Sequence, residues 1–317
     1  MTFQIQKIEN QIFKPSISGN IKRLVELFVK DYLSPCTKSA YAKDIQRFFQ
    51  FCLNKGYIFN HPRDIQSIHL REYRDWLLSE GYQNSTVIRH MASLRQLMNY
   101  CVIEGVVDRN PLLNVQYPKH KNISTTNAFT DEEVKQMLLL PHRESYSGLL
   151  HYTVLLTLFY LGLRKSELVN LRTSDFVEER NHFAVRICGK GNKIRTIAIQ
   201  PFIRTALENY LKASNRVFAK DDFMFKPVRN NFSKDTDKPL HPETINWIVW
   251  RYAQKAGVVK NISPHSCRAT VVSNLLDKKI PIVNVAVMMG HSSPTTTMLY
   301  SKRHDDLDQS AAYNVNY

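Results

Sequence analysis

Apolar residues recur every three or four positions along most of this 317-residue chain, a spacing typical of amphipathic helices. From residue 21 to about residue 115 the pattern predicts helices alone. Tyr41, Ile45, Phe48 and Cys52, for example, fall on one helical face. A second series of helical patterns runs from residue 129 towards the C-terminus. The chain is therefore expected to fold as packed helices, with any sheet confined to the short intervals between them.

Only two runs have the composition of β-strands, residues 183–188 and 195–199. The turn sequence Gly189-Lys190-Gly191-Asn192 joins them, so they are expected to pair as an antiparallel hairpin. Helices are expected at residues 70–79, from about 85, 148–161, from about 164, 203–213, 243–256, 265–276, 282–289 and 296–301, with a loop at 214–240. We therefore predict a mostly α protein with one small antiparallel β-sheet or hairpin.

The length of the chain and one aperiodic segment predict two domains. A chain of 317 residues exceeds the usual size of a single core. Residues 117–128 are polar, basic and without periodicity, so they are interpreted as a linker between a helical domain at 21–116 and a second domain at 129–303. Residues 1–20 are expected to form an N-terminal tail and residues 304–317 a C-terminal one.

Charge and cysteine usage restrict the class of partner. The chain has 43 Lys and Arg against 28 Asp and Glu, a formal charge of +15, so a polyanion is expected: nucleic acid first and an anionic membrane second. The longest apolar stretch, residues 149–163, is too short to span a bilayer, and the N-terminus has no apolar signal core. The five cysteines are scattered and form no CxxC, which predicts free thiols in the cytoplasm rather than a zinc site.

Five short segments of the second domain carry most of the reactive side chains. They are 161–168 (LGLRKSEL), 189–195 (GKGNKIR), 264–270 (PHSCRAT), 289–293 (MGHSS) and 295–300 (TTTMLY). Their order, spacing and flanking residues resemble the tyrosine recombinase (phage integrase) family, and within it most of all the Xer-type site-specific recombinases. The resemblance covers residues 125–303 closely and the helical first domain more loosely.

The resemblance implies a helical, SAM-like core-binding domain followed by a catalytic domain. It implies an enzyme that cleaves and rejoins duplex DNA through a 3′-phosphotyrosyl intermediate, for integration, excision or resolution of DNA, with no metal and no cofactor. The implied partners are double-stranded DNA and further protomers, as a homotetramer or a heterotetramer with a related recombinase on two DNA sites. The tail at 304–317 would dock onto a neighbouring protomer, and the location would be the cytoplasm, at the nucleoid.

Matched motif by motif, the family's catalytic residues become Arg164, Lys190, His265, Arg268, His291 and Tyr300, with Glu167 in support. The residue types suit the chemistry, because attack on a phosphodiester builds negative charge that the protein must neutralise. Two arginines, each a planar fork that stays protonated, can do so. Outside the motif, Arg164 would be interpreted as a helix-surface residue paired with Glu167, and His291 as part of a helix C-cap beside Gly290.

The remaining assignments have alternatives of their own. His265 and Arg268 lie three residues apart and share a helical face, although a lone histidine is more often structural. Lys190 at the hairpin tip would be the general acid that protonates the leaving 5′ oxygen, with Lys193 as a competitor for that role. Tyr300 is one of 15 tyrosines, and its place nine residues after His291 selects it as the nucleophile.

Two departures from the family pattern remove no reacting group. Cys267 stands where an aliphatic residue is usual, which is interpreted as a change in packing, and Ala269-Thr270 replaces the commoner His-Thr or His-Ser pair. Two other functions stay open: a type IB topoisomerase-like strand transferase, which shares this chemistry, and a DNA-binding protein on the same scaffold that does not cut. Candidate DNA contacts on polar helix faces, which a merely solvated basic surface would also explain, are Lys38, Lys43, Arg47, Arg89 and Arg95.

Overall fold

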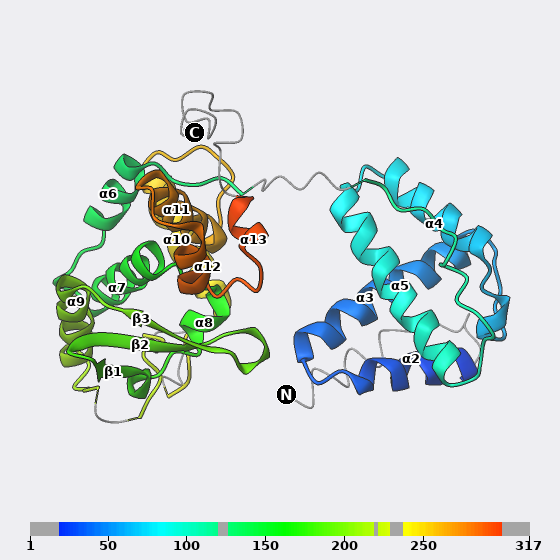
Figure 1. The fold of residues 1–317 in the computed structure, drawn as a ribbon, viewed down its shortest axis with the longest axis horizontal. Coiled ribbons are helices and arrows are strands. Elements are labelled where there is room, and N and C mark those ends of the chain that lie inside the picture. The colour runs from blue at the N-terminus through cyan, green and yellow to red at the C-terminus, as the bar shows by residue number, and fades with distance from the viewer. Residues whose placement is uncertain (1–18, 120–125, 219–220, 229–236, 300–317) are drawn as a thin grey trace, which may run out of the picture. The chain divides into compact units, whose positions relative to one another are not determined.

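The structure, a computed structural model, describes residues 19–119, 126–218, 221–228 and 237–299. The chain divides into two compact units, residues 1–121 and 122–317, and each unit is built mainly from helices (Figure 1). One small antiparallel sheet lies in the second unit. The prediction of a mostly α protein with two domains and a small sheet is therefore confirmed.

Within residues 19–119, the described part of the first unit, four helices pack around one apolar core. They are α2 (Gly19–Asp31), α3 (Pro35–Asn54), α4 (Ser67–Ser79) and α5 (Asn84–Ile103), with a 3₁₀ turn, η1, at Pro62–Asp64. Phe48, Tyr73 and Met91, from three different helices, are almost fully buried in that core. Ser34 caps α3 by accepting a hydrogen bond from the Thr37 N–H, and Pro35 follows in the first turn, where a proline costs no hydrogen bond.

A charged side chain is buried inside this unit and joins its helices. Asp44 on α3 is 2% exposed and accepts hydrogen bonds from the Arg89 guanidinium and from Ser93 Oγ, the latter at 2.7 Å, both on α5. His90 Nδ1 lies 3.5 Å from Asp44 Oδ1 and 3.0 Å from the hydroxyl of Tyr73 on α4. A buried carboxylate is tolerated only with such partners, so this network stabilises the packing of α3 against α5.

Asp44→Ala is therefore expected to destabilise the protein by about 3 kcal/mol, because it leaves Arg89 and Ser93 without their acceptor and opens a cavity. The measurement is the urea unfolding midpoint of the first unit. Lys43→Ala, at the neighbouring exposed position, is the matched control and should unfold at the wild-type midpoint. Equal midpoints for the two variants would show that the Asp44 network adds nothing to stability.

The second unit surrounds one buried helix, α7. Its helices are α6 (Asp131–Leu139), α7 (Tyr146–Leu161), α8 (Lys165–Val169), α9 (Pro201–Lys212), α10 (Pro242–Lys255), α11 (Pro264–Asp277), α12 (Ile282–Met289) and α13 (Pro294–Met298). Because α7 is apolar on every side, it is covered by other elements rather than lying at the surface, and α6, α9, α10 and α11 pack against it. None of the helices described in either unit has both the length and the apolar character needed to cross a membrane.

The sheet has one strand more than the sequence predicts. Its order is β1 (Phe176–Glu179), β2 (His182–Cys188) and β3 (Ile194–Ala198), all antiparallel, and the turn between β2 and β3 contains a 3₁₀ segment, η3 (Lys190–Asn192). The β2–β3 hairpin is as predicted. Strand β1 was missed because its acidic half hides the alternation. The sequence signal that could have revealed β1 is the two-residue segment Arg180-Asn181 before β2. In the structure this segment is the turn between β1 and β2, and both of its φ angles are positive (52° and 63°), as a tight hairpin requires.

Local capping signals explain most helix boundaries. Thr130 and Glu133, a Thr-x-x-Glu spacing that predicts a helix start, form a reciprocal cap of α6 with bonds of 2.7 and 3.2 Å. Gly162, at φ +59°, ends α7 in the left-handed conformation that favours glycine. The prediction of a last helix at residues 296–301 was wrong in its start, since Ser293 caps α13 and Pro294 begins it. The predicted end of that helix lies outside the described residues.

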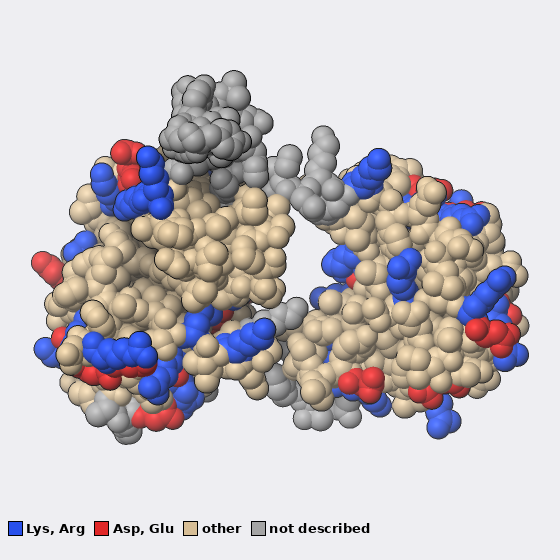
Figure 2. All heavy atoms as spheres, viewed as in Figure 1, with Lys and Arg blue, Asp and Glu red and all other residues tan. Residues whose placement is uncertain are grey.

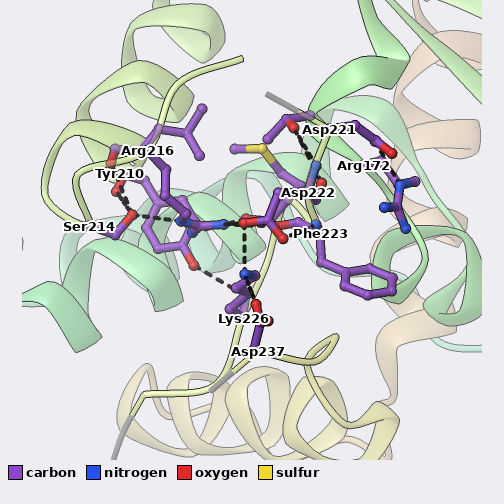
Figure 3. A network of polar contacts seen from close by, with 12 residues as sticks. Arg172, Tyr210, Ser214, Arg216, Asp221, Asp222, Phe223, Lys226 and Asp237 are labelled. Carbon is purple, nitrogen blue, oxygen red and sulfur yellow. Dashed lines mark hydrogen bonds and ion pairs between the residues drawn. The ribbon is translucent and has the colours of Figure 1, made fainter. Parts of the chain in front are cut away.

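The segment predicted as a loop, residues 214–240, is held by polar contacts where it is described (Figure 3). Arg216 donates to the carbonyl of Phe223 at 2.7 Å, and Lys226 Nζ lies 2.7 Å from both Asp222 and Asp237. Arg172, in the segment before β1, pairs with Asp221 at 2.7 Å. These bonds replace a regular backbone ladder, which explains how a polar segment without periodicity keeps a defined course.

Candidate active site

Arg164 is placed by the turn between α7 and α8. Gly162 ends α7, and Arg164 then occupies the N-cap position of α8, with Glu167 one turn further on. The Arg164 backbone N–H and its Nη1 each donate to the Glu167 carboxylate at 2.8 Å, while Nη2 donates to the Gly290 carbonyl at 3.1 Å. The pair with Glu167, considered in the sequence as a purely structural alternative, is thus present. It orients Arg164 towards the segment that contains His291.

Arg268 is buried where two helices end. Its side chain comes from α11, is 1% exposed, and donates to the carbonyl of Gly162 at 2.7 Å and to that of Met289. Those carbonyls belong to the C-terminal ends of α7 and α12, where the backbone carries partial negative charge. The guanidinium therefore replaces water with acceptors at two helix ends, which helps a cation to lie inside the protein.

His291 follows the glycine that ends α12. Gly290 is in the left-handed conformation at φ +62°, and the His291 N–H donates to the Ala286 carbonyl, so its backbone does form the helix cap that the sequence also allowed. Its ring Nδ1 lies 2.8 Å from the hydroxyl of Thr297 on α13. Burial first, and then the charges of Arg268 and Arg164, lower the pKa of His291 to about 4. The imidazole is consequently neutral at physiological pH.

This low pKa has a consequence for stability. An unfolded histidine titrates near pH 6.5, so between pH 6.5 and about 4 the unfolded chain binds a proton that the folded protein excludes at His291. The stability contributed by the neutral ring is present above pH 6.5 and is lost as the pH falls towards 4. The urea midpoint of His291→Gln should therefore fall less steeply than that of the wild type over this range. Parallel curves would mean that His291 titrates normally in the folded protein.

His265 stands at the start of α11, one turn before Arg268. Ser263 and Pro264 begin the helix and bring the imidazole to its exposed end. Partial burial of the ring, followed by the positive charges of Arg268 and Arg164, lowers the pKa of His265. The charges of Arg164 and Arg268 also act on His291, and both guanidiniums donate to the carbonyls of Met289 and Gly290 directly before it. These four side chains therefore form one cationic cluster, called the cationic pocket below.

The structure describes only the backbone of Lys190, and Tyr300 lies outside the described residues. The backbone of Lys190 lies in η3 at the tip of the β2–β3 hairpin, as predicted, and the structure does not describe its side chain. Lys193, its competitor, is exposed at the other end of the turn, where its carbonyl accepts the Gly189 N–H at 2.9 Å. Tyr300 and the tail at 304–317 lie outside the described residues, which end at Leu299, just after α13.

One residue of the pocket was not singled out by the sequence. Arg195 on β3 donates from Nη1 and Nη2 to the two carboxylate oxygens of Glu167, at 3.0 and 2.8 Å. Burial alone would raise the pKa of Glu167, but hydrogen bonds from Arg195 and Arg164 hold it below its usual value. The only sequence signal was that Arg195 closes the 189–195 segment. An arginine on a half-exposed strand gives no spacing that predicts a buried partner.

Cys267, between the two catalytic candidates of α11, is fully buried in the core of the second unit. The unusual thiol is therefore a packing residue, as the sequence suggested.

The candidate DNA contacts of the first unit differ in how available they are. Arg89 is held by Asp44, and Arg95 donates to the Leu112 carbonyl at 3.1 Å and lies 4.8 Å from the Tyr117 ring. Arg47 rests on Tyr82, and Lys38 is half-buried. Lys43 is exposed. On the face drawn in Figure 2, basic side chains are spread over both units among acidic ones rather than gathered into one patch.

Comparisons with known proteins agree with this geometry. The sequence model described as "Phage integrase family" matches residues 127–306, and the one described as "Phage integrase, N-terminal SAM-like domain" matches residues 23–105. A tyrosine recombinase of Pseudothermotoga lettingae is 29% identical over 270 residues, covering 84% of this chain and 87% of the relative. Tyrosine recombinase XerD of Pseudomonas aeruginosa is 28% identical over 277 residues, covering 87% and 89%.

Solved structures share the fold. A lambda integrase dimer (75–356) bound to a COC′ core site aligns with a TM-score of 0.66 at 15% identity, covering 92% of this chain and 95% of that one. The XerH site-specific recombinase in its pre-cleavage complex with difH aligns with a TM-score of 0.64 at 20% identity, covering 87% and 78%. With a family match over more than half of its length, the chain belongs to the phage integrase family.

Proposed function

We propose that this chain is a site-specific DNA recombinase that cleaves and rejoins duplex DNA through a 3′-phosphotyrosyl intermediate, for integration, excision or resolution of DNA. The observation that carries the proposal is the cationic pocket: Arg164, Arg268, His265 and His291, from three separate segments, act on one another electrostatically. Such a pocket suits a phosphodiester, whose non-bridging oxygens gain negative charge as the phosphorus is attacked.

Each side chain of the pocket has a role in holding the phosphate. Arg164 and Arg268 neutralise the non-bridging oxygens with charged N–H donors, and Glu167 keeps Arg164 in orientation. His291 is neutral and hydrogen-bonded to Thr297 through Nδ1, so its other ring nitrogen, Nε2, would donate to a phosphate oxygen. A neutral donor at this point adds a hydrogen bond without adding charge to a pocket that is already strongly positive.

The cleavage step moves two protons and exchanges one bond. The Tyr300 oxygen forms a bond to phosphorus as its phenolic proton passes to His265, and the bond from phosphorus to the 5′ oxygen breaks. Lys190, or Lys193 in its place, donates a proton to the departing oxygen and leaves a free 5′ hydroxyl. Rejoining is the reverse step with the 5′ hydroxyl of another strand, so the energy of the phosphodiester is retained and no cofactor takes part.

The assembly that we propose follows from the reaction. Exchange between two duplex sites needs four nucleophiles, and therefore a homotetramer or a heterotetramer with a related recombinase, acting in the cytoplasm at the nucleoid. The tail at residues 304–317 would link each protomer to the next. Deleting residues 304–317 should then weaken cooperative assembly on DNA. Unchanged cooperativity would remove this part of the proposal.

The test is covalent trapping combined with a two-site assay. Wild-type protein is incubated, with chelator and no divalent metal, with nicked duplexes made from genomic fragments that flank its gene. An adduct that survives denaturant, together with recombinant products from a plasmid carrying two sites, supports a recombinase. An adduct with relaxation of supercoiled DNA but no recombinants would indicate a topoisomerase-like enzyme. Bound DNA without any adduct would indicate a DNA-binding protein that does not cut.

A further inference from the structure

Arg195 is the point at which three segments of the pocket meet. Its side chain is 9% exposed and makes a two-bond contact with Glu167 of α8, while its Nε donates to the Met288 carbonyl of α12 at 2.8 Å. The residue itself belongs to β3, the return strand of the hairpin, where it pairs with Ile187 of β2. One guanidinium thus links the hairpin, α8 and the end of α12.

Two glycines show how closely the backbone surrounds this guanidinium. A Cβ added at Gly290 would lie 3.0 Å from Arg195 Nη1, and one added at Gly189 would lie 3.5 Å from the same atom. Gly290 directly precedes His291, and Gly189 directly precedes Lys190. Arg195 therefore lies against the backbone of both segments, one holding the proposed phosphate donor and the other the proposed general acid.

We propose that Arg195 is a positioning residue that fixes the base of the hairpin against the phosphate pocket and so sets the position of the general acid at the tip. The proposal deepens the proposed function and rests on its assignment of Lys190, or Lys193, as the acid. Arg195 itself need not touch DNA. It acts through Gly189 on one side, and through Glu167 and the end of α12 on the other.

The chemistry of the contact explains why an arginine stands here. A guanidinium has donors in a fixed plane, so it can hold both oxygens of a carboxylate and a carbonyl at the same time. A lysine ammonium has no such fork and cannot keep this geometry. Glu167 is 7% exposed, and each of its carboxylate oxygens already accepts one bond from Arg164, so Arg195 adds a second charged donor to each oxygen of a buried carboxylate.

Loss of the Arg195 side chain should mainly slow the step in which the general acid protonates the leaving 5′ oxygen. The tip of the hairpin continues directly from β2 and β3, so a small shift at Gly189 would move Lys190 away from the leaving oxygen. Misplacement of a reacting group by about 1 Å can slow a reaction by roughly 10²-fold. Arg268 is anchored separately, by the carbonyls of Gly162 and Met289 at two helix ends. Arg164 shares Glu167 with Arg195 but keeps its own bonds to that carboxylate and to the Gly290 carbonyl.

The test compares two DNA substrates that differ in one atom. The first is the normal nicked duplex, and the second has sulfur in place of the 5′ bridging oxygen at the cleaved bond. A thiolate leaves without protonation, so the second substrate needs no general acid. Arg195→Gln and Arg195→Lys are assayed for adduct formation on both, beside Lys190→Ala and Lys193→Ala as references for loss of the acid. Arg186→Gln, an exposed arginine on β2 of the same sheet, is the matched control.

We expect both Arg195 variants to lose roughly 10²-fold on the oxygen substrate and to recover most of that loss on the sulfur substrate, as the acid variant does. Arg186→Gln should match the wild type on both. Thermal unfolding and DNA binding are measured alongside, and Arg195→Lys, which keeps the charge, serves if Arg195→Gln does not fold. Equal losses on both substrates, or no loss at all, would overturn the proposal while leaving the acid assignment intact. If sulfur rescues neither lysine variant, the acid assignment itself fails, and this inference fails with it.

Discussion

Replacing Tyr300 by phenylalanine should abolish the covalent protein–DNA adduct and leave DNA binding unchanged. The substitution removes one oxygen, which is the atom that would bond to phosphorus. A phenol with a pKa near 10 is mostly neutral at pH 7, and the cationic pocket around Arg164, Arg268 and His265 is what would favour its ionisation during attack. No other group in the pocket can replace that oxygen, so the adduct rate should fall by at least about 10⁴-fold.

The measurement is adduct formation on the nicked duplex, with binding followed separately by gel shift. Tyr313→Phe is the matched control, because it removes the same atom from a tyrosine of the C-terminal tail, and it should form the adduct at the wild-type rate. Proteolysis of the wild-type adduct should give a DNA-linked peptide that contains Tyr300. An adduct that persists in Tyr300→Phe would assign the reaction to a different tyrosine.

Arg268→Ala should have the second largest effect, because this one side chain serves both the pocket and the core. The alanine leaves the carbonyls of Gly162 and Met289, at the ends of α7 and α12, without their charged donor. We expect a loss of about 3 kcal/mol in the free energy of unfolding, since each hydrogen bond from a charged group contributes about 1.5–3 kcal/mol. Adduct formation should fall by roughly 10³-fold, as for loss of a donor to a developing oxyanion.

Arg164→Ala separates the two contributions. The Arg164 side chain is 34% exposed, so its removal should slow adduct formation to a similar degree and change the unfolding midpoint much less. Urea unfolding and single-turnover trapping, measured on the same preparations, test both statements. If Arg268→Ala unfolded at the wild-type midpoint, the hydrogen bonds to the Gly162 and Met289 carbonyls would not contribute to stability. Arg268 would then serve only to bind the phosphate.

Much of the fold was predictable because its signals are local. Apolar spacing located the helices, the glycine-rich turn located the β2–β3 hairpin, and Thr130 with Glu133 marked the start of α6. Those patterns depend on residues three or four positions apart, or on the residues of one turn, and can therefore be recognised from the sequence alone. Strand β1 was missed because four residues with two acids show too little alternation to be distinguished from a loop.

The order and spacing of the motifs also selected Arg164, His265, Arg268 and His291 as candidates, but not the contacts that hold these side chains in place. The partners are distant along the chain: Arg195 and Glu167 are 28 residues apart, Arg268 and Gly162 are 106 apart, and Arg164 and Gly290 are 126 apart. No periodicity connects such positions. The same reason explains why the sequence did not predict the bonds that Arg89 and Arg95 make within the first unit, to Asp44 and to the Leu112 carbonyl.

The sequence by itself thus determined the helices, the hairpin and the family, and it selected the candidate reactive side chains, because each follows from short-range patterns or from motifs in a fixed order. Tertiary structure alone decided that Arg268 is buried between two helix ends, that Glu167 is shared by two arginines, and that Arg195 joins the hairpin to the pocket. A buried charge is stable only where packing brings its partners together, and those partners come from elements that meet only in the folded chain.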